Sequence, residues 1–174
     1  MGVSHPYKAR PVGASVDWLT PPDILKRLGK FDLDPCCPEN MPWRTATTMF
    51  IKNQNDGLKS KWHGRVWLNP PYGSETGKWM ARMAEHGDGI ALIFARTETK
   101  MFFDHVWPKA SGLLFLAGRP HFHHVSGKRA AGNSGGPIVL VAYDGKTSNW
   151  NALCNSKIPG MCVDLGQCKK RGKG

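Results

Sequence analysis

The run GIALIFA, residues 89–95, constrains the fold more than any other stretch of the chain. It is continuously apolar and is bounded by glycine and polar residues, which is typical of a strand covered on both faces of a parallel sheet. Further strands are predicted at residues 31–35, 49–51, 65–68, 111–118 and 136–143, and helices at residues 21–28, 75–85 and 98–107. This alternation predicts an α/β fold with a parallel or mixed sheet of doubly wound type, in which ligands bind beyond the carboxyl ends of the strands.

The first predicted helix carries its own start and stop signals. Thr20 is a good N-cap residue, and Asp23 follows it by three positions, as in a capping box. Pro21 suits the first helical position, and Gly29 ends the apolar pattern.

The length and composition indicate one domain. With 174 residues, of which 40% are hydrophobic, the chain can form a single core, and we assign it to residues 16–145. A flexible basic arm is expected at residues 1–15, and a basic, mostly disordered tail at residues 146–174, which are low in apolar pattern and end in KKRGKG. No apolar run approaches the length of a membrane span, and the N-terminus has no apolar signal-peptide core. We therefore expect a soluble cytoplasmic protein that is monomeric or weakly dimeric.

The charge of the chain favours a nucleic-acid partner. There are 24 Lys and Arg against 13 Asp and Glu, a net charge of +11, which is the electrostatic footprint expected of a DNA or RNA binder. A solubility charge or an acidic protein partner are the alternatives. Residues 119–135, RPHFHHVSGKRAAGNSG, form a basic, glycine-containing segment that is the candidate DNA-recognition loop. In it, Phe122 is a candidate for base stacking, and Arg119, Lys128 and Arg129 are candidates for phosphate contacts.

Neither a disulfide framework nor a metal site is expected. The chain has five cysteines at irregular positions, an odd number that fits reduced thiols. A zinc site would draw on the histidines of the loop and the cysteines near the C-terminus. These are His121, His123, His124, Cys154, Cys162 and Cys168. The cysteines lack the close C-x2-C spacing of structural zinc sites, so no metal is predicted.

The stretch VWLNPPY, residues 66–72, places chemistry at the end of a predicted strand. Asn69 offers a side-chain carbonyl and Pro70 a backbone carbonyl, and the two prolines stiffen the turn. Two such acceptors can hold the hydrogens of an exocyclic amine, while Tyr72 stacks on the face of a flat heterocycle. The lone pair of an aromatic amine is delocalised, so acceptors that pull it toward a tetrahedral geometry favour attack on a methyl donor. The stretch therefore predicts a binding site for an adenine.

The same tetrad resembles a known catalytic signature. NPPY after an apolar strand is similar to the motif of amino methyltransferases that use S-adenosylmethionine. Three more stretches resemble segments of the DNA adenine-N6 group: DWLTPP, LDPCC and NDGL. Together with GRPHF, they make the chain similar to the small phage-type DNA N6-adenine methyltransferase (Dam) family over about residues 17–143.

The resemblance implies a fold, a reaction and a set of site residues. The implied fold is the Rossmann-like methyltransferase fold, and the implied reaction is methyl transfer from S-adenosyl-L-methionine to adenine N6 in double-stranded DNA, after the base has flipped out. The implied catalytic residues are Asn69, Pro70, Pro71 and Tyr72. The implied cofactor contacts are Thr20 and Pro21 for the methionine part, Asp34 and Pro35 at the end of the first strand, and Asp56 for the adenine amine. The implied setting is phage methylation or restriction-modification.

The chain also departs from the pattern. The loop PCCPEN lacks a Gly-x-Gly turn, and only 35 residues (69 − 34) separate Asp34 from Asn69. No separate carboxylate for the cofactor ribose is identifiable, and Asp56 is an alternative candidate for that role. Both aspartates also fit plain turn or cap residues.

Two kinds of rival function remain open from the residues alone. A methyltransferase with this tetrad can act on another amine, such as cytosine N4, an RNA base or a protein glutamine. The chain also fits a DNA-binding module without catalytic activity. A glutamine methyltransferase would not need a charge of +11, and the intact tetrad argues against a silent module. The DNA target sequence is not readable from the chain.

Overall fold

The computed structural model describes residues 17–166 and shows one mixed seven-stranded sheet with helices on both faces. The strands are β1 (Leu33–Cys37), β2 (Thr48–Ile51), β3 (Val66–Leu68), β4 (Gly89–Phe94), β5 (Gly112–Leu116), β6 (Ile138–Tyr143) and β7 (Gly160–Asp164). The helices are α1 (Pro22–Leu28), α2 (Thr76–His86), the π-helix η1 (Phe102–Val106) and α3 (Asn149–Asn155). The predicted α/β class and mixed sheet are confirmed.

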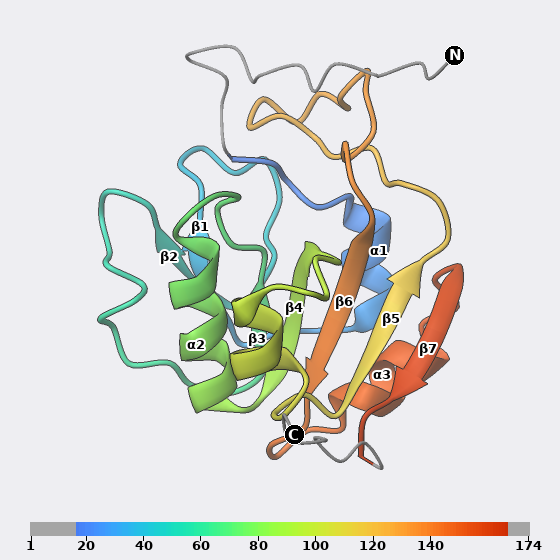
Figure 1. Cartoon of the computed structure of the whole chain (residues 1–174). Coiled ribbons are helices and arrows are strands. Elements are labelled where there is room, and N and C mark those ends of the chain that lie inside the picture. The colour runs from blue at the N-terminus through green and yellow to red at the C-terminus, as the bar shows by residue number, and fades with distance from the viewer. Residues whose placement is uncertain (1–16, 167–174) are drawn as a thin grey trace.

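The sheet has a parallel half and an antiparallel half. Its order is β2-β1-β3-β4-β6-β5-β7. Strands β2, β1, β3 and β4 pair in parallel, whereas β6 is antiparallel to both β4 and β5, and β7 is antiparallel to β5. Since β5 is antiparallel to β6 and β6 to β4, the carboxyl ends of β1, β3, β4 and β5 all lie at the same edge of the sheet. This edge is at the top of Figure 1.

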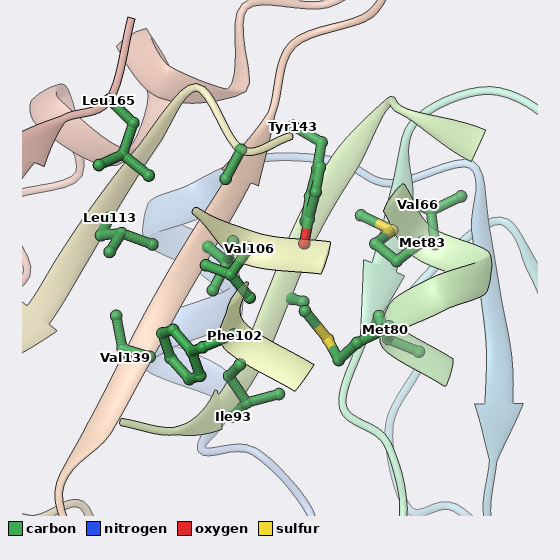
Figure 2. Packing of buried hydrophobic residues seen from close by; sticks show 14 of the residues in the cluster. Val66, Met80, Met83, Ile93, Phe102, Val106, Leu113, Val139, Tyr143 and Leu165 are labelled. Carbon is green, nitrogen blue, oxygen red and sulfur yellow. The ribbon is translucent and has the colours of Figure 1, made fainter. Parts of the chain in front are cut away.

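Both faces of the central strands are buried, which explains why their sequences are continuously apolar. In β4 and its partner β6, alternate side chains point to opposite faces, and Ile93 and Val139 belong to one core cluster while Leu92 and Leu140 belong to the other. The first cluster lies under α2 and η1, where Met80 and Phe102 pack against the sheet, as Figure 2 shows. The second cluster lies under α1 and α3.

Several predicted boundaries are wrong. The tail prediction fails for residues 149–164, because α3 packs on the sheet through the fully buried Leu153 and β7 pairs with β5 along five residues. The sparse apolar pattern there reflects an edge strand whose side chains are mostly exposed. The strand predicted at residues 31–35 is shifted to Leu33–Cys37 and runs through Pro35, with an irregular register against β2. The arm at residues 1–15 and Cys168 lie outside the described residues.

The predicted capping box is also absent. Helix α1 begins at Pro22 with Pro21 as its N-cap residue, and no side chain caps it. Thr20 therefore lies before the helix, and its hydroxyl has no hydrogen-bond partner in the part of the chain that the structure describes. Within residues 17–166 there is no helix with the length and apolar character needed to cross a membrane.

Candidate active site

The tetrad Asn69–Tyr72 directly follows β3, at the edge where the parallel strands end. On the neighbouring strand β1, the same edge carries Asp34 and Cys36. Residues 17–20, which precede α1, pass beside this edge and line a cavity together with both groups. The topology thus brings together three stretches that are far apart in the sequence.

The side chain of Asn69 has a fixed orientation. Its Nδ2 donates a hydrogen bond of 2.6 Å to the main-chain carbonyl of Trp18, which is possible only for the nitrogen end of the amide. Within residues 17–166, its Oδ1 has only a long contact of 3.5 Å from the Tyr72 hydroxyl. The Cys36 thiol donates to the main-chain carbonyl of Asn69 at 3.3 Å. Asn69 therefore presents a carbonyl oxygen whose acceptor capacity is nearly unused.

The rest of the tetrad is held from the side of α2. The Thr76 hydroxyl donates to the carbonyl of Pro71 at 2.8 Å. Among the described residues, no hydrogen bond reaches the carbonyl of Pro70, the second predicted acceptor. The Tyr72 ring lies 4.7 Å from the Phe94 ring and 6.1 Å from the Phe122 ring, between centroids. Burial raises the pKa of Tyr72 well above its usual range, so this phenol stays neutral.

Phe122, which the sequence suggested for base stacking on a surface loop, is instead buried. Its side chain is 4% exposed and belongs to the core cluster under α1, because the segment around it folds back on the sheet. Its ring supports Tyr72 and is not presented to solvent. By contrast, the other three DNA-contact candidates are exposed on the same segment. They are Arg119, Lys128 and Arg129.

A first cavity is lined by three buried polar side chains, those of Thr20, Asp34 and Thr45. Asp34 is 4% exposed and accepts hydrogen bonds from the Thr45 hydroxyl at 2.5 Å and from the Cys36 N–H at 3.1 Å. Burial raises the pKa of Asp34 to about 6, although both hydrogen bonds favour the charged form. Thr20 is 1% exposed, and its hydroxyl has no hydrogen-bond partner among the described residues. Buried hydroxyls are rarely unpaired in folded proteins, so an unpaired one beside a cavity indicates a ligand.

A second cavity of about 390 Å³ adjoins the first and shares Asp17, Cys36 and Pro71 with it. Its wall includes the aromatic rings of Phe50 and Trp79 and the side chain of Asp56. Aromatic walls with a few polar groups are typical of sites for flat heterocycles. The two adjoining linings therefore combine buried polar groups on one side with aromatic rings on the other.

Asp56 has a turn role as well as a place on this wall. It is exposed and forms an ion pair of 3.0 Å with Lys59, and its Oδ1 accepts the N–H groups of Leu58 and Lys59. Hydrogen bonding to Lys59 lowers the pKa of Asp56. The next residue, Gly57, is buried so closely under β1 that a Cβ atom there would lie 1.8 Å from the Pro35 carbonyl oxygen. Only glycine allows this approach.

Sequence reasoning did not predict the hydrogen-bonding roles of three residues of the site: Trp18, Cys36 and Thr45. Trp18 and Cys36 hold Asn69, and Thr45 holds Asp34. Trp18 is the second residue of the DWLTPP stretch, but its contribution is a main-chain carbonyl, which a side-chain pattern does not show. Cys36 acts as a thiol donor, since burial raises its pKa well above the usual range.

The histidines of the loop face other aromatic rings. His124 contacts Trp18, and His123 contacts Trp43, with ring centroids 4.9 Å and 5.3 Å apart. In residues 17–166, no three His, Cys, Asp or Glu side chains lie close enough to hold a metal ion.

Comparisons with known proteins give one match. The family model described as DNA N-6-adenine-methyltransferase (Dam) matches residues 11–156. Neither the curated proteins nor the solved structures gave a match. The matched residues include the tetrad, both cavities and the 119–135 segment.

Proposed function

Because the chain belongs to the DNA N-6-adenine-methyltransferase (Dam) family, we propose that it transfers a methyl group from S-adenosyl-L-methionine to N6 of adenine in double-stranded DNA. The single observation that carries the proposal is the fixed carboxamide of Asn69, with its nitrogen committed to Trp18 and its oxygen directed elsewhere. An amine with two N–H groups is the natural partner of this oxygen and of the Pro70 carbonyl.

The tetrad acts by alignment. The oxygen of Asn69 and the carbonyl of Pro70 accept the two N6 hydrogens and direct the nitrogen lone pair out of the ring plane. The Tyr72 ring, backed by Phe94 and Phe122, braces the face of the base. When bound, the cofactor would supply the methyl group from its sulfonium sulfur, which would become a neutral thioether. No strong base is needed, because N6 loses its extra proton to water after it has gained the methyl group.

The residues that line the two adjoining cavities suit the two ends of the cofactor. Thr20 and Asp34 in the first cavity would hold its methionine part, since an unpaired hydroxyl and a buried carboxylate match an amino acid end. The aromatic wall and Asp56 in the second cavity would hold its adenosine part. Pro35 lines the second cavity, whereas Pro21 is buried beside Thr20 and lines neither cavity.

The DNA would lie along the edge where the strands end. Arg119, Lys128 and Arg129 are exposed there and suit phosphate contacts, in line with the net charge of +11. The target adenine must leave the duplex to reach Asn69, and flipping costs a few kcal/mol, which the stack on Tyr72 and the N6 hydrogen bonds offset.

A direct test uses the purified protein, labelled S-adenosyl-L-methionine and unmethylated plasmid DNA, followed by nucleoside analysis. We expect N6-methyladenine with the parent protein and none with Asn69→Ala. Methyl label on cytosine N4, on RNA or on protein instead would assign another acceptor. Cofactor binding without any methylated product would overturn the proposed activity.

A further inference from the structure

Trp18 lies between the catalytic asparagine and the surface of the 119–135 segment. Its main-chain carbonyl accepts the Asn69 amide, and its ring lies 4.9 Å from the ring of His124, tilted by 48°. The next residue, Leu19, exchanges two hydrogen bonds of 2.9 Å with the main chain of His123. The carbonyl that orients Asn69 is thus fixed by contacts with residues 123 and 124.

His124 begins a tight turn on the surface. Its N–H donates to the carbonyl of Lys128 at 2.9 Å, and its carbonyl accepts the N–H of Gly127 at 2.8 Å. Gly127 has a φ of 82°, which favours glycine. His124, Ser126, Lys128 and Arg129 are all exposed. The contact with Trp18 therefore connects the active site to a turn that carries two cations suited to DNA phosphates.

We propose that Trp18 is a positioning residue for Asn69 and that His124 holds Trp18 in place. The hydrogen bond to Trp18 is the one bond to the Asn69 amide nitrogen among the described residues. The Asn69 side chain has two rotatable bonds, so a shift of the Trp18 carbonyl turns its oxygen away from the substrate amine. A displacement of about 1 Å at a reacting group can lower a rate about 100-fold.

The catalytic part of this inference rests on the proposed function, but the positional part does not. The alternative is that His124 contacts DNA directly and has no effect on Asn69. The two roles give different kinetics. A positioning role lowers the rate of methyl transfer from the bound complex, whereas a DNA contact raises the Kd for DNA.

The kinetic test compares Trp18→Ala, Trp18→Phe, His124→Ala and the double alanine variant in single-turnover methylation, with saturating DNA and cofactor. We expect a rate loss of about 10-fold to 100-fold for each alanine variant, with the Kd for DNA and cofactor within about twofold of the parent. We expect the double variant to be no slower than the slower single one, because both act through the same carbonyl. Trp18→Phe keeps a ring against His124 and should restore most of the rate.

His63→Ala is the matched control. His63 is exposed and precedes β3, at the opposite edge of the sheet from Asn69. Multiplying rate losses in the double variant, or a higher Kd for DNA at an unchanged rate in His124→Ala, would overturn the inference.

A second readout needs no activity. The side-chain amide protons of Asn69, assigned by their absence in Asn69→Ala, should shift in the proton–nitrogen NMR spectrum of His124→Ala and stay in place in His63→Ala. An unchanged signal in His124→Ala would refute the positional link. A shifted signal in a protein whose parent form methylates no DNA would instead refute the proposed function and keep the link.

Discussion

Asn69 and Trp18 are 51 positions apart in the chain, and one hydrogen bond of 2.6 Å joins the side-chain nitrogen of the first to the main-chain oxygen of the second. This bond decides which end of the carboxamide faces the substrate. It also explains why an amide, rather than a carboxylate, stands at position 69. A carboxylate would place two acceptors against each other at this distance.

We expect Asn69→Asp to lower methylation about 100-fold or more at pH 8, because the carboxylate and the Trp18 carbonyl repel each other. As the pH falls, protonation gives the new side chain an O–H that can donate to Trp18, so its activity relative to the parent should rise. Asn69→Ala cannot recover in this way. The pH profiles of the three proteins in single-turnover assays check the prediction, and identical pH profiles for Asn69→Asp and Asn69→Ala would contradict it.

Asp34 should make the stability of the protein depend on pH. Burial raises its pKa from 3.8 to about 6, so the folded state binds a proton that the unfolded state releases between these values. The free energy of unfolding should therefore decrease from about pH 4 to about pH 6 by about 2 to 3 kcal/mol for this group alone, and stay at the lower level above pH 6. Asp34→Asn should remove this contribution. Urea unfolding of both proteins at pH 4, 5, 6 and 7 measures the difference in slope.

A cationic ligand beside Asp34 would lower the pKa that burial has raised. Such a ligand favours the carboxylate and so releases a proton when it binds below pH 6. Calorimetry of S-adenosyl-L-methionine binding at pH 5.5 in two buffers with different ionisation enthalpies should detect the proton. An equal apparent enthalpy in both buffers would show that Asp34 does not change its protonation.

An added methyl group at Gly57 should distort the wall of the second cavity. The added Cβ of Gly57→Ala meets the Pro35 carbonyl oxygen at 1.8 Å, so the NDGL loop must move away from β1. We expect a loss of about 1 to 3 kcal/mol in unfolding free energy and a weaker affinity for the cofactor. Gly77→Ala is the control, because a Cβ at this helical position meets no atom within 4 Å. Equal Tm values and cofactor affinities for the two variants would contradict the prediction.

Arg129 should contribute to DNA binding through charge alone. We expect Arg129→Ala to weaken binding to all DNA sequences to a similar extent and to reduce the slope of log K against log salt by about 1. Lys109→Ala is a suitable control, since Lys109 is exposed and precedes β5, at the opposite edge from the site. Fluorescence anisotropy with labelled duplexes between about 50 and 200 mM salt measures both variants. A loss confined to one DNA sequence would show base recognition instead.

The sequence predicted the elements whose patterns depend on burial. The apolar runs of β4, β5 and β6 are visible because both of their faces are covered, and the tetrad is visible because its residue types are unusual at a strand end. The position of Asn69 beside Asp34 also followed from the parallel pairing of β1 and β3.

The parts that sequence reasoning missed depend on contacts between distant segments. Thr20 fitted a helix cap by its spacing, but Pro21 and Pro22 start α1 without it, and its hydroxyl is left beside the cavity. Phe122 lies in a basic stretch, yet its ring is drawn into the core by the space next to Tyr72. The position of the Thr20 hydroxyl and the burial of Phe122 both depend on distant residues, so no local sequence pattern predicts them.

The position of β7 has a consequence for how the protein is produced. This strand lies after the residues that the family model matches, and it covers the outer side of β5 by pairing with it. A version cut after Asn155 would leave the backbone N–H and C=O groups of β5 open to a strand from another molecule. A protein shortened to the residues that the family model matches, 11–156, would therefore aggregate during expression.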